Sequence, residues 1–400
     1  MSDACPGWAV GLDLSEDAAD LLVTLDSLPL VDHHVHGATT QDLARADLEQ
    51  MLTESDRAIP AWMTAFDSQV GLAVRRWCAP ILDLPPHAPP EEYVRRRLEL
   101  GGVEVTRRLL QASGIGCFVL ETGFRSDDIL DTAGMADLSG IPTTQVLRIE
   151  SMMEELALQQ PTAADFMAVV IDRLASRRAS IVGLKSIIAY RFGFDFDPQP
   201  PGRDEVVRAT ERWLREVAAT SVARVSDPVL LRAGIWAAAE LAVPLQLHTG
   251  YGDPDLDLHR CDPLLLTNWL RMVEGSGMDV MLLHCYPFQR NAGYLAQVFP
   301  HVYMDVGLGV NYTASRSPEV IAESIELAPF AKVMFSSDAW GPAELHFLGA
   351  LWWRRGMYRL LASWIAAGEW SVNDACRVAR MMGVHNARRA YGLDGLAASS

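Results

Sequence analysis

Residues 30–36 read LVDHHVH, and this stretch sets the pattern for the rest of the chain. An apolar, β-branched run typical of a buried strand ends in histidines. Because side chains alternate along a strand, His34 and His36 point to the same side. Two imidazoles spaced in this way can reach one divalent ion at the ~2.0–2.1 Å of a zinc–nitrogen bond. The HxH pair alone is a weak signal, since many such pairs arise by chance.

Further apolar stretches follow, and helical patterns separate them. We predict strands at residues 30–35, 116–121, 143–149, 181–187, 244–248, 279–284, 301–306 and 332–338. Strands that alternate with helices form parallel sheets, and eight such units are what a closed barrel needs. The sequence therefore predicts an α/β fold, a (β/α)8 TIM-type barrel.

Two connections are longer than a simple barrel link. Residues 37–100 follow the first predicted strand, and residues 188–243 follow the fourth. Each leaves the C-terminal end of a strand, where barrel active sites are built. We expect helical insertions there that wall the site, within a single domain spanning residues 1–400.

Chemically active side chains also close other predicted strands. His248 ends PLQLH, His284 ends VMLLH and Asp338 ends VMFSSD, while Lys185 lies in GLKS near the end of the fourth strand. The C-terminal ends of barrel strands share one mouth, so these side chains are expected to converge there. Lys185 has a plainer interpretation as a buried ion-pair partner. The set as a whole nevertheless indicates a metal-binding, proton-transferring site.

These positions resemble the amidohydrolase superfamily. Its pattern is HxH on strand one, often Lys on strand four, His on strands five and six, and Asp on strand eight. Three longer stretches, PLQLHTGYGDPDLDL, LLHCYPFQRNAGYLAQVFPHVYMDVGL and FSSDAWGPAELHFLGA, resemble its amidohydrolase-2 branch. In particular, they look like the nodulin-like domain of glutamine-synthetase fusion proteins, over residues 28–393. The synthetase-like module is absent from these 400 residues.

The resemblance implies a divalent metal and roles for individual residues. Zinc is the favoured ion, with Mn²⁺ or Fe²⁺ as alternatives, because mixed nitrogen and oxygen sites do not select sharply. Asp338 would also act as general base toward a metal-activated water, with Ser336 and Ser337 holding its carboxylate. His284 would polarise the substrate or orient the water. The implied metal ligands are His34, His36, His248, Asp338 and Lys185.

Lys185 carries an open choice. Carbamylated, it would bridge to a second metal; as a plain ammonium, it would bind a substrate carboxylate. Arg148, Tyr190 and Arg191 follow the third and fourth strands, and arginine forks grip carboxylates. These three residues are therefore candidates for substrate binding, although an ordinary ion-pair role is equally compatible with each arginine.

The expected activity is hydrolysis of a C–N bond, amide-type and plausibly γ-glutamyl, in a small carboxylate-bearing substrate. A metal-dependent decarboxylase or isomerase on the same barrel is the alternative, because the groups that discriminate them sit in loops. A non-catalytic binding domain would not need this set of residues.

The amino-acid composition limits the kinds of partner that this protein is expected to bind. The formal net charge of −17 disfavours nucleic acid and anionic membranes, and 50% hydrophobic residues exclude general disorder. The cysteines are scattered rather than arranged as a disulfide framework, which indicates a reducing compartment. The acidic residues near the N-terminus are not typical of a signal peptide. We expect a cytoplasmic enzyme that acts on a small-molecule substrate. Assembly into a homo-oligomer is compatible with the sequence.

Overall fold

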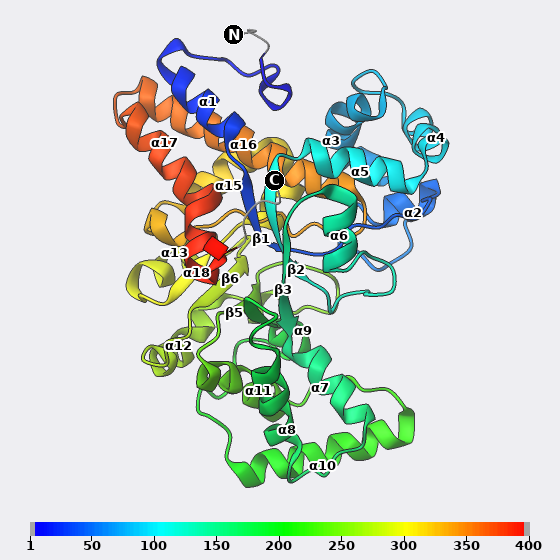
Figure 1. Cartoon of the computed structure of the whole chain (residues 1–400), viewed down its shortest axis with the longest axis vertical. Coiled ribbons are helices and arrows are strands. Elements are labelled where there is room, and N and C mark those ends of the chain that lie inside the picture. The colour runs from blue at the N-terminus through cyan, green and yellow to red at the C-terminus, as the bar shows by residue number, and fades with distance from the viewer. Residues whose placement is uncertain (1–4, 396–400) are drawn as a thin grey trace.

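A parallel sheet of seven strands forms the centre of the molecule, with neighbours in sequence order (Figure 1). A computed structural model describes residues 5–395, so residues 1–4 and 396–400, the ends of the expected domain, lie outside the described residues. The strands are β1 (Leu30–Val35), β2 (Ile115–Glu121), β3 (Thr143–Arg148), β4 (Gly183–Ser186), β5 (Leu245–Thr249), β6 (Val280–His284) and β7 (Val302–Met304). Parallel neighbours in sequence order with helices between them make a TIM-type α/β fold.

The expected eighth strand does not form as a strand. Residues 330–332 are a short 3₁₀ helix, and residue 333 makes only an isolated bridge to Met304 of β7. The following residues still connect the two sheet edges, because Met334 N donates to Met304 O and His33 N donates to Phe335 O. The ladder is irregular, because Phe335 N donates to Met382 O and Ser337 N donates to the Asp32 carboxylate, neither of which is a carbonyl of β1 or β7. The prediction of a regular strand at 332–338 is therefore wrong, although the segment occupies the eighth position.

Helices surround the sheet and connect its strands. Between successive strands from β2 onward lie α6 (Thr132–Ser139), α7 (Ile149–Leu158), α8 (Phe166–Arg177), α11 (Pro228–Leu241), α12 (Thr267–Val273) and α13 (Gln289–Val298). Local chemistry sets their ends: Asp227 caps α11 by accepting a hydrogen bond from Val229 N, and Pro228 occupies its first turn. α14 (Gly307–Thr313) and α15 (Ser317–Ser324) follow β7.

The two long connections contain additional helices. After β1 come α2 (Arg45–Gln50), α3 (Gln69–Ala73), α4 (Pro90–Leu100) and α5 (Gly102–Ala112), the group to the right of the sheet in Figure 1. After β4 come α9 (Ile188–Arg191) and α10 (Arg203–Thr220), below the sheet in the same view. Residues from both connections reach the C-terminal ends of the strands, as the lining of the cavity described below shows.

The C-terminal quarter is helical and anchors the barrel. α16 (Ala343–Ala366) packs against α5, α14 and α15, and α1 (Ala19–Ser27) packs against α17 (Val372–Arg380). α18 (Asn386–Tyr391) ends in Tyr391, which reaches beneath β1. Glu344 of α16 is fully buried and binds Arg97 of α4 through two hydrogen bonds of 2.6 and 3.2 Å. This ion pair ties the long first connection to the C-terminal helices.

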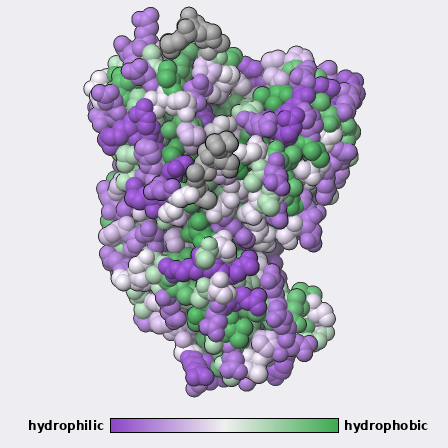
Figure 2. Space-filling view, viewed as in Figure 1, coloured by the Kyte–Doolittle hydropathy of each residue, from purple (hydrophilic) through white to green (hydrophobic). Residues whose placement is uncertain are grey.

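The face of the molecule drawn in Figure 2 mixes hydrophilic and hydrophobic residues. Polar and apolar residues are interspersed over the face in Figure 2, without one dominant apolar patch. Among residues 5–395, no helix combines the length and the hydropathy that crossing a bilayer requires.

Candidate metal centre and catalytic cavity

The C-terminal ends of the strands open into a cavity of about 450 Å³, a volume suited to a small molecule. Nearly all the residues singled out from the sequence line it: His36, Arg148, Lys185, Tyr190, Arg191, His248, His284 and Asp338. His34 is fully buried directly beneath. The structure thus brings the predicted residues together, from strands as distant in sequence as β1 and the segment that ends at Asp338.

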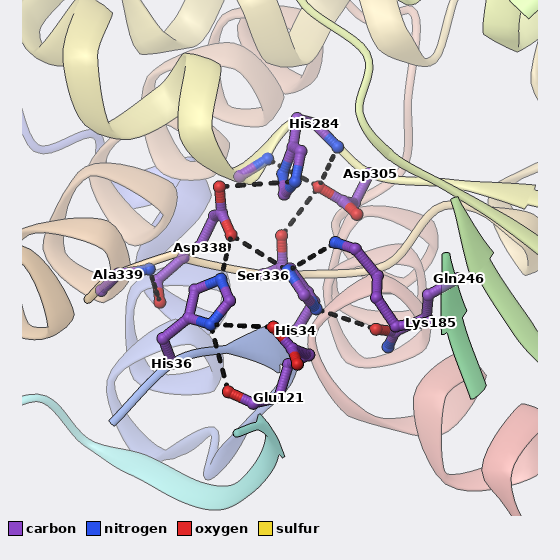
Figure 3. A network of polar contacts seen from close by, with 12 residues as sticks. His34, His36, Glu121, Lys185, Gln246, His284, Asp305, Ser336, Asp338 and Ala339 are labelled. Carbon is purple, nitrogen blue, oxygen red and sulfur yellow. Dashed lines mark hydrogen bonds and ion pairs between the residues drawn. The ribbon is translucent and has the colours of Figure 1, made fainter. Parts of the chain in front are cut away.

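Asp338 lies at the centre of the cluster (Figure 3). Its Oδ1 is 3.0 Å from His34 Nε2 and 3.6 Å from His36 Nε2, and its Oδ2 is 3.4 Å from His284 Nε2. Donor atoms of His34, His284 and Asp338 all lie within 4.8 Å of one another, a spacing at which one ion could contact all three.

Backbone conformation aims these side chains. Asp338 and His284 have positive φ angles of 49° and 68°, an uncommon conformation for residues other than glycine. Asp338 N donates to His34 O, and His284 N donates to the Asp305 carboxylate at 3.0 Å. Such strained positions persist only where the surroundings hold them, and they concentrate at functional sites.

The Nδ1 atoms of His34 and His36 each have a hydrogen-bond partner. His34 Nδ1 is 2.8 Å from Gln246 Oε1, and His36 Nδ1 is 3.1 Å from the backbone oxygen of Glu121. Both partners are acceptors, so each Nδ1 carries the hydrogen and each Nε2 keeps its lone pair. This arrangement is how proteins orient histidines that ligate a metal.

His248 provides a further imidazole nitrogen that could bind a metal. Its ring packs 4.7 Å from that of His284 and 4.3 Å from that of Tyr190, measured between centroids. His248 Nε2 is buried and has no hydrogen-bond partner among the residues that the structure describes. A buried polar atom left unpaired is costly, and a divalent ion would satisfy it. The donor set therefore fits a metal of the kind that imidazole and carboxylate bind.

Burial sets the protonation of the cluster. It lowers the pKa of His34 well below its usual value, and the charge of Lys185 lowers it further. Burial also lowers the pKa of His36 to about 4 and that of His248 and His284 well below the usual range. Neutral imidazoles keep their lone pairs available for ligation. Burial raises the pKa of Asp338 well above its usual value, against the opposing charge of Lys185.

Lys185 lies inside the cluster. Only 2% of the residue is exposed, and its Nζ is 3.2 Å from His34 Nε2. Burial lowers the pKa of Lys185 to about 8. This position is compatible with either role expected for Lys185, and its carbamylation stays a prediction.

The serines before Asp338 act differently from what their position in the sequence predicts. Ser336 Oγ donates to Asp305 Oδ1 at 2.7 Å, and Ser337 Oγ donates to Asp32 Oδ2 at 2.5 Å. The expectation that they hold the Asp338 carboxylate is wrong, because each hydroxyl donates to another buried aspartate, Asp305 or Asp32. Asp305 also binds His33 Nε2 at 3.1 Å, and it therefore links β1, β6 and β7 to the closing segment.

Two residues of the site escaped the sequence analysis. Gln246 orients His34, as described above. Glu121 is fully buried at the end of β2, 3.3 Å from His36 Nδ1, and it also pairs with Arg148. Glu121 carries the same signal as the residues that were found, a charged side chain closing an apolar strand.

The two arginines expected to bind substrate line the cavity and retain unpaired donors. Arg148 pairs with Glu121, and Arg191 Nη2 lies 3.2 Å from Glu154 Oε1. Arg148 Nε and Arg191 Nη1 are buried without a hydrogen-bond partner within residues 5–395. The arginines are therefore in ion pairs and still offer N–H groups to a ligand.

Comparisons with known proteins agree with this geometry. The sequence model of the amidohydrolase family matches residues 150–393. Protein fluG of Emericella nidulans is 32% identical over 254 residues, which cover 59% of this chain and 28% of fluG. The chain thus spans little more than a quarter of this curated relative.

Solved structures share the fold. A protein from Lactobacillus casei ATCC 334, to which a metal-dependent hydrolase activity is ascribed, matches with a TM-score of 0.81 and 26% identity over 95% of this chain and 98% of that chain. Uronate isomerase from Thermotoga maritima matches with a TM-score of 0.58 and 10% identity over 92% and 96% of the two chains, which shows the fold alone. With a family match that covers more than half of its length, this chain belongs to the amidohydrolase family.

Proposed function

We propose that this protein is a metal-dependent hydrolase that cleaves the amide-type C–N bond of a small carboxylate-bearing substrate. The observation that carries the proposal is the pairing, in one cavity, of the His–Asp cluster with buried, unpartnered N–H groups of Arg148 and Arg191. Guanidinium N–H groups bind carboxylates with charge-assisted hydrogen bonds. γ-Glutamyl amides have a carboxylate near a secondary amide and are the first candidates.

The residues have distinct roles in this proposal. A bound divalent ion, zinc before Mn²⁺ or Fe²⁺, would supply Lewis-acid chemistry, lowering the pKa of water and polarising a carbonyl. His34, His36, His248 and Asp338 would hold it. His284 lies in the same cluster and is either a further ligand or the group that polarises the substrate. Lys185 would bind a second ion when carbamylated or the substrate when unmodified.

Asp338 is the proton-transfer group. Its carboxylate oxygens face the cavity and the imidazoles, so it can accept a proton from the attacking water. The same proton then goes to the departing nitrogen. Tyr190 lines the cavity beside His248 and would orient the substrate with Arg148 and Arg191.

A product assay with the metal-loaded enzyme tests the proposal. Expected products are the free amine from a panel of L-γ-glutamyl amides, with an Asp338→Asn variant as the matched inactive control. Aromatic carboxylates and sugar acids form the opposing panel. Release of CO₂, or isomerisation of the sugar acid without amine release, would replace the hydrolase by the decarboxylase or isomerase alternative. A cytoplasmic location and assembly into a homo-oligomer stay predictions.

A further inference from the structure

A second cavity of about 450 Å³ lies beside the catalytic one. The loop after α2, the residues that follow β5 and β6, and the end of α14 supply most of its lining, including Leu52, Ile59, Met63, Tyr251, Tyr286 and Tyr312. The Tyr251 ring packs edge to face on Tyr286 and Tyr312, with centroid distances of 5.8 and 6.1 Å. Such an apolar, aromatic wall suits an apolar group, and above all an aromatic ring.

Two residues join this cavity to the catalytic one. Thr53 and Glu54 line both. The second cavity therefore adjoins the reacting centre rather than opening on a remote part of the surface.

The position of this cavity in the barrel determines which part of a substrate would enter it. Arg148 and Arg191 follow β3 and β4, whereas Tyr286 and Tyr312 follow β6 and β7. The His–Asp cluster adjoins both groups: Lys185 of β4, which precedes Arg191, lies 3.2 Å from His34 Nε2, and His284 ends β6 two residues before Tyr286. A substrate whose carboxylate is held by the arginines would extend past the cluster toward the tyrosines.

We propose that the second cavity is the subsite for the amine portion of the substrate, and that this portion is apolar and preferably aromatic. The inference rests on the proposed function. In a γ-glutamyl amide the carboxylate belongs to the acyl side, so the group beyond the scissile bond is the amine substituent. Hydrolysis there forms a C–O bond from water, breaks the C–N bond and transfers a proton to the amine nitrogen.

The subsite also has a polar contact to offer. Tyr251 Oη is buried and has no hydrogen-bond partner in the part of the chain that the structure describes. Glu54 stands at the junction of the two cavities. Burial raises the pKa of Glu54 to about 7. The Tyr251 hydroxyl and the Glu54 carboxyl group, beside an apolar wall, can accept hydrogen bonds from an arylalkyl ammonium, which is the form of the released amine at neutral pH.

The experiment compares γ-glutamyl benzylamide with γ-glutamyl methylamide, with the metal-loaded full chain. Wild-type enzyme is expected to favour the benzylamide by ~10–10²-fold in kcat/KM, the usual worth of extra apolar groups in a fitted pocket. The double variant Ile59→Asn/Met63→Asn makes the wall polar without adding charge, and it is expected to remove most of that preference. Trp62→Asn is the matched control: it lies on the same loop, is 83% exposed and lines neither cavity.

A binding measurement separates this inference from the proposed function. In calorimetry, benzylamine is expected to bind more tightly than methylamine, and the double variant is expected to lose the difference. Amides cleaved without preference for benzyl over methyl, or equal binding of the two amines, would overturn the subsite and leave the hydrolase standing. If no amide is cleaved but benzylamine binds selectively and only the double variant loses it, the hydrolase fails and the apolar amine subsite stands.

Discussion

Gln246 fixes the orientation of His34. Gln246 Oε1 lies 2.8 Å from His34 Nδ1, and Gln246 Nε2 donates to His33 O and to Tyr391 Oη, each at 2.8 Å. The two donor contacts determine which end of the amide is the oxygen, and the oxygen determines which nitrogen of His34 carries hydrogen. His34 Nε2 is consequently left with its lone pair toward Asp338.

Replacing Gln246 should weaken metal binding without touching a ligand. Gln246→Leu removes the acceptor for His34 Nδ1, and loss of such an orienting contact typically lowers affinity by 10–100-fold. Competition with a chromogenic chelator would measure the shift. Gln145→Leu is the control, because the side-chain amide of Gln145 donates to Thr122 Oγ1 and lies outside the cluster. Equal affinities in wild type and Gln246→Leu would contradict the role.

The paired histidines of β1 should be required for the metal. A His34→Ala/His36→Ala variant loses two imidazole donors and is expected to be purified without the ion that wild type retains. Elemental analysis checks this, with His259→Ala as control because His259 is exposed. Full metal content in the double variant would refute the site.

The same analysis of His284→Ala decides between the two roles of His284. Its nitrogen shares the 4.8 Å cluster with His34 and Asp338, so loss of the metal would make it a ligand. Metal retained with slowed turnover would support the substrate-polarising role.

Asp338→Asn should impair the chemical step. The amide keeps the shape of the side chain but cannot accept the proton, and loss of a general base costs ~10²–10⁴-fold in kcat. KM should change less, because binding is assigned to other groups. Steady-state kinetics on whichever amide is cleaved measures both. An Asp338→Asn enzyme with near wild-type kcat would exclude Asp338 as the base.

Gly252 should tolerate no side chain. A Cβ at this residue would lie 1.9 Å from Tyr190 Oη and 3.3 Å from His248 Cε1. Gly252→Ala must therefore displace Tyr190 from the cavity, and misplacement by about 1 Å can cost ~10²-fold in activity. Gly202→Ala is the matched control, since a Cβ there meets nothing within 4 Å. Equal kcat/KM for the two variants would show that Tyr190 is not needed.

The Arg97–Glu344 pair should dominate the stability of the first connection. Glu344→Ala leaves a buried guanidinium uncompensated, which costs ~3–5 kcal/mol. Urea unfolding measures it, with the more exposed Glu104→Ala expected within about 1 kcal/mol of wild type. Burial raises the pKa of Glu344, but Arg97 lowers it below its ordinary value of 4.5. The contribution is therefore fully present above pH 4.5 and is lost progressively as the pH falls from 4.5 through the lower pKa of the folded state. A small effect of Glu344→Ala would contradict this account.

The sequence predicted those parts of the protein that follow from alternation along a strand. β1 lies at the predicted residues 30–35, and His284 and Asp338 point into one cavity because the ends of parallel strands share an edge. The regular eighth strand was not predictable: KVMFSSD has a strand pattern, but the N–H groups of Phe335 and Ser337 donate to the Met382 carbonyl and the Asp32 carboxylate instead of to neighbouring strands. The hydrogen bonds of Ser336 and Gln246 were likewise hidden, because they join residues distant along the chain.

The irregular segment that closes the barrel between β7 and β1 makes the geometry of the catalytic cluster depend on barrel closure. Asp338 lies in the stretch that bonds to β7 through Met334 and to β1 through His33. A local fluctuation that breaks these hydrogen bonds would therefore also separate the Asp338 carboxylate from the imidazoles of the cluster. An ion that binds only the intact cluster would stabilise the closed conformation of this segment. Amide hydrogen exchange at His33 and Asp338 would then slow in proportion to the occupancy of the ion.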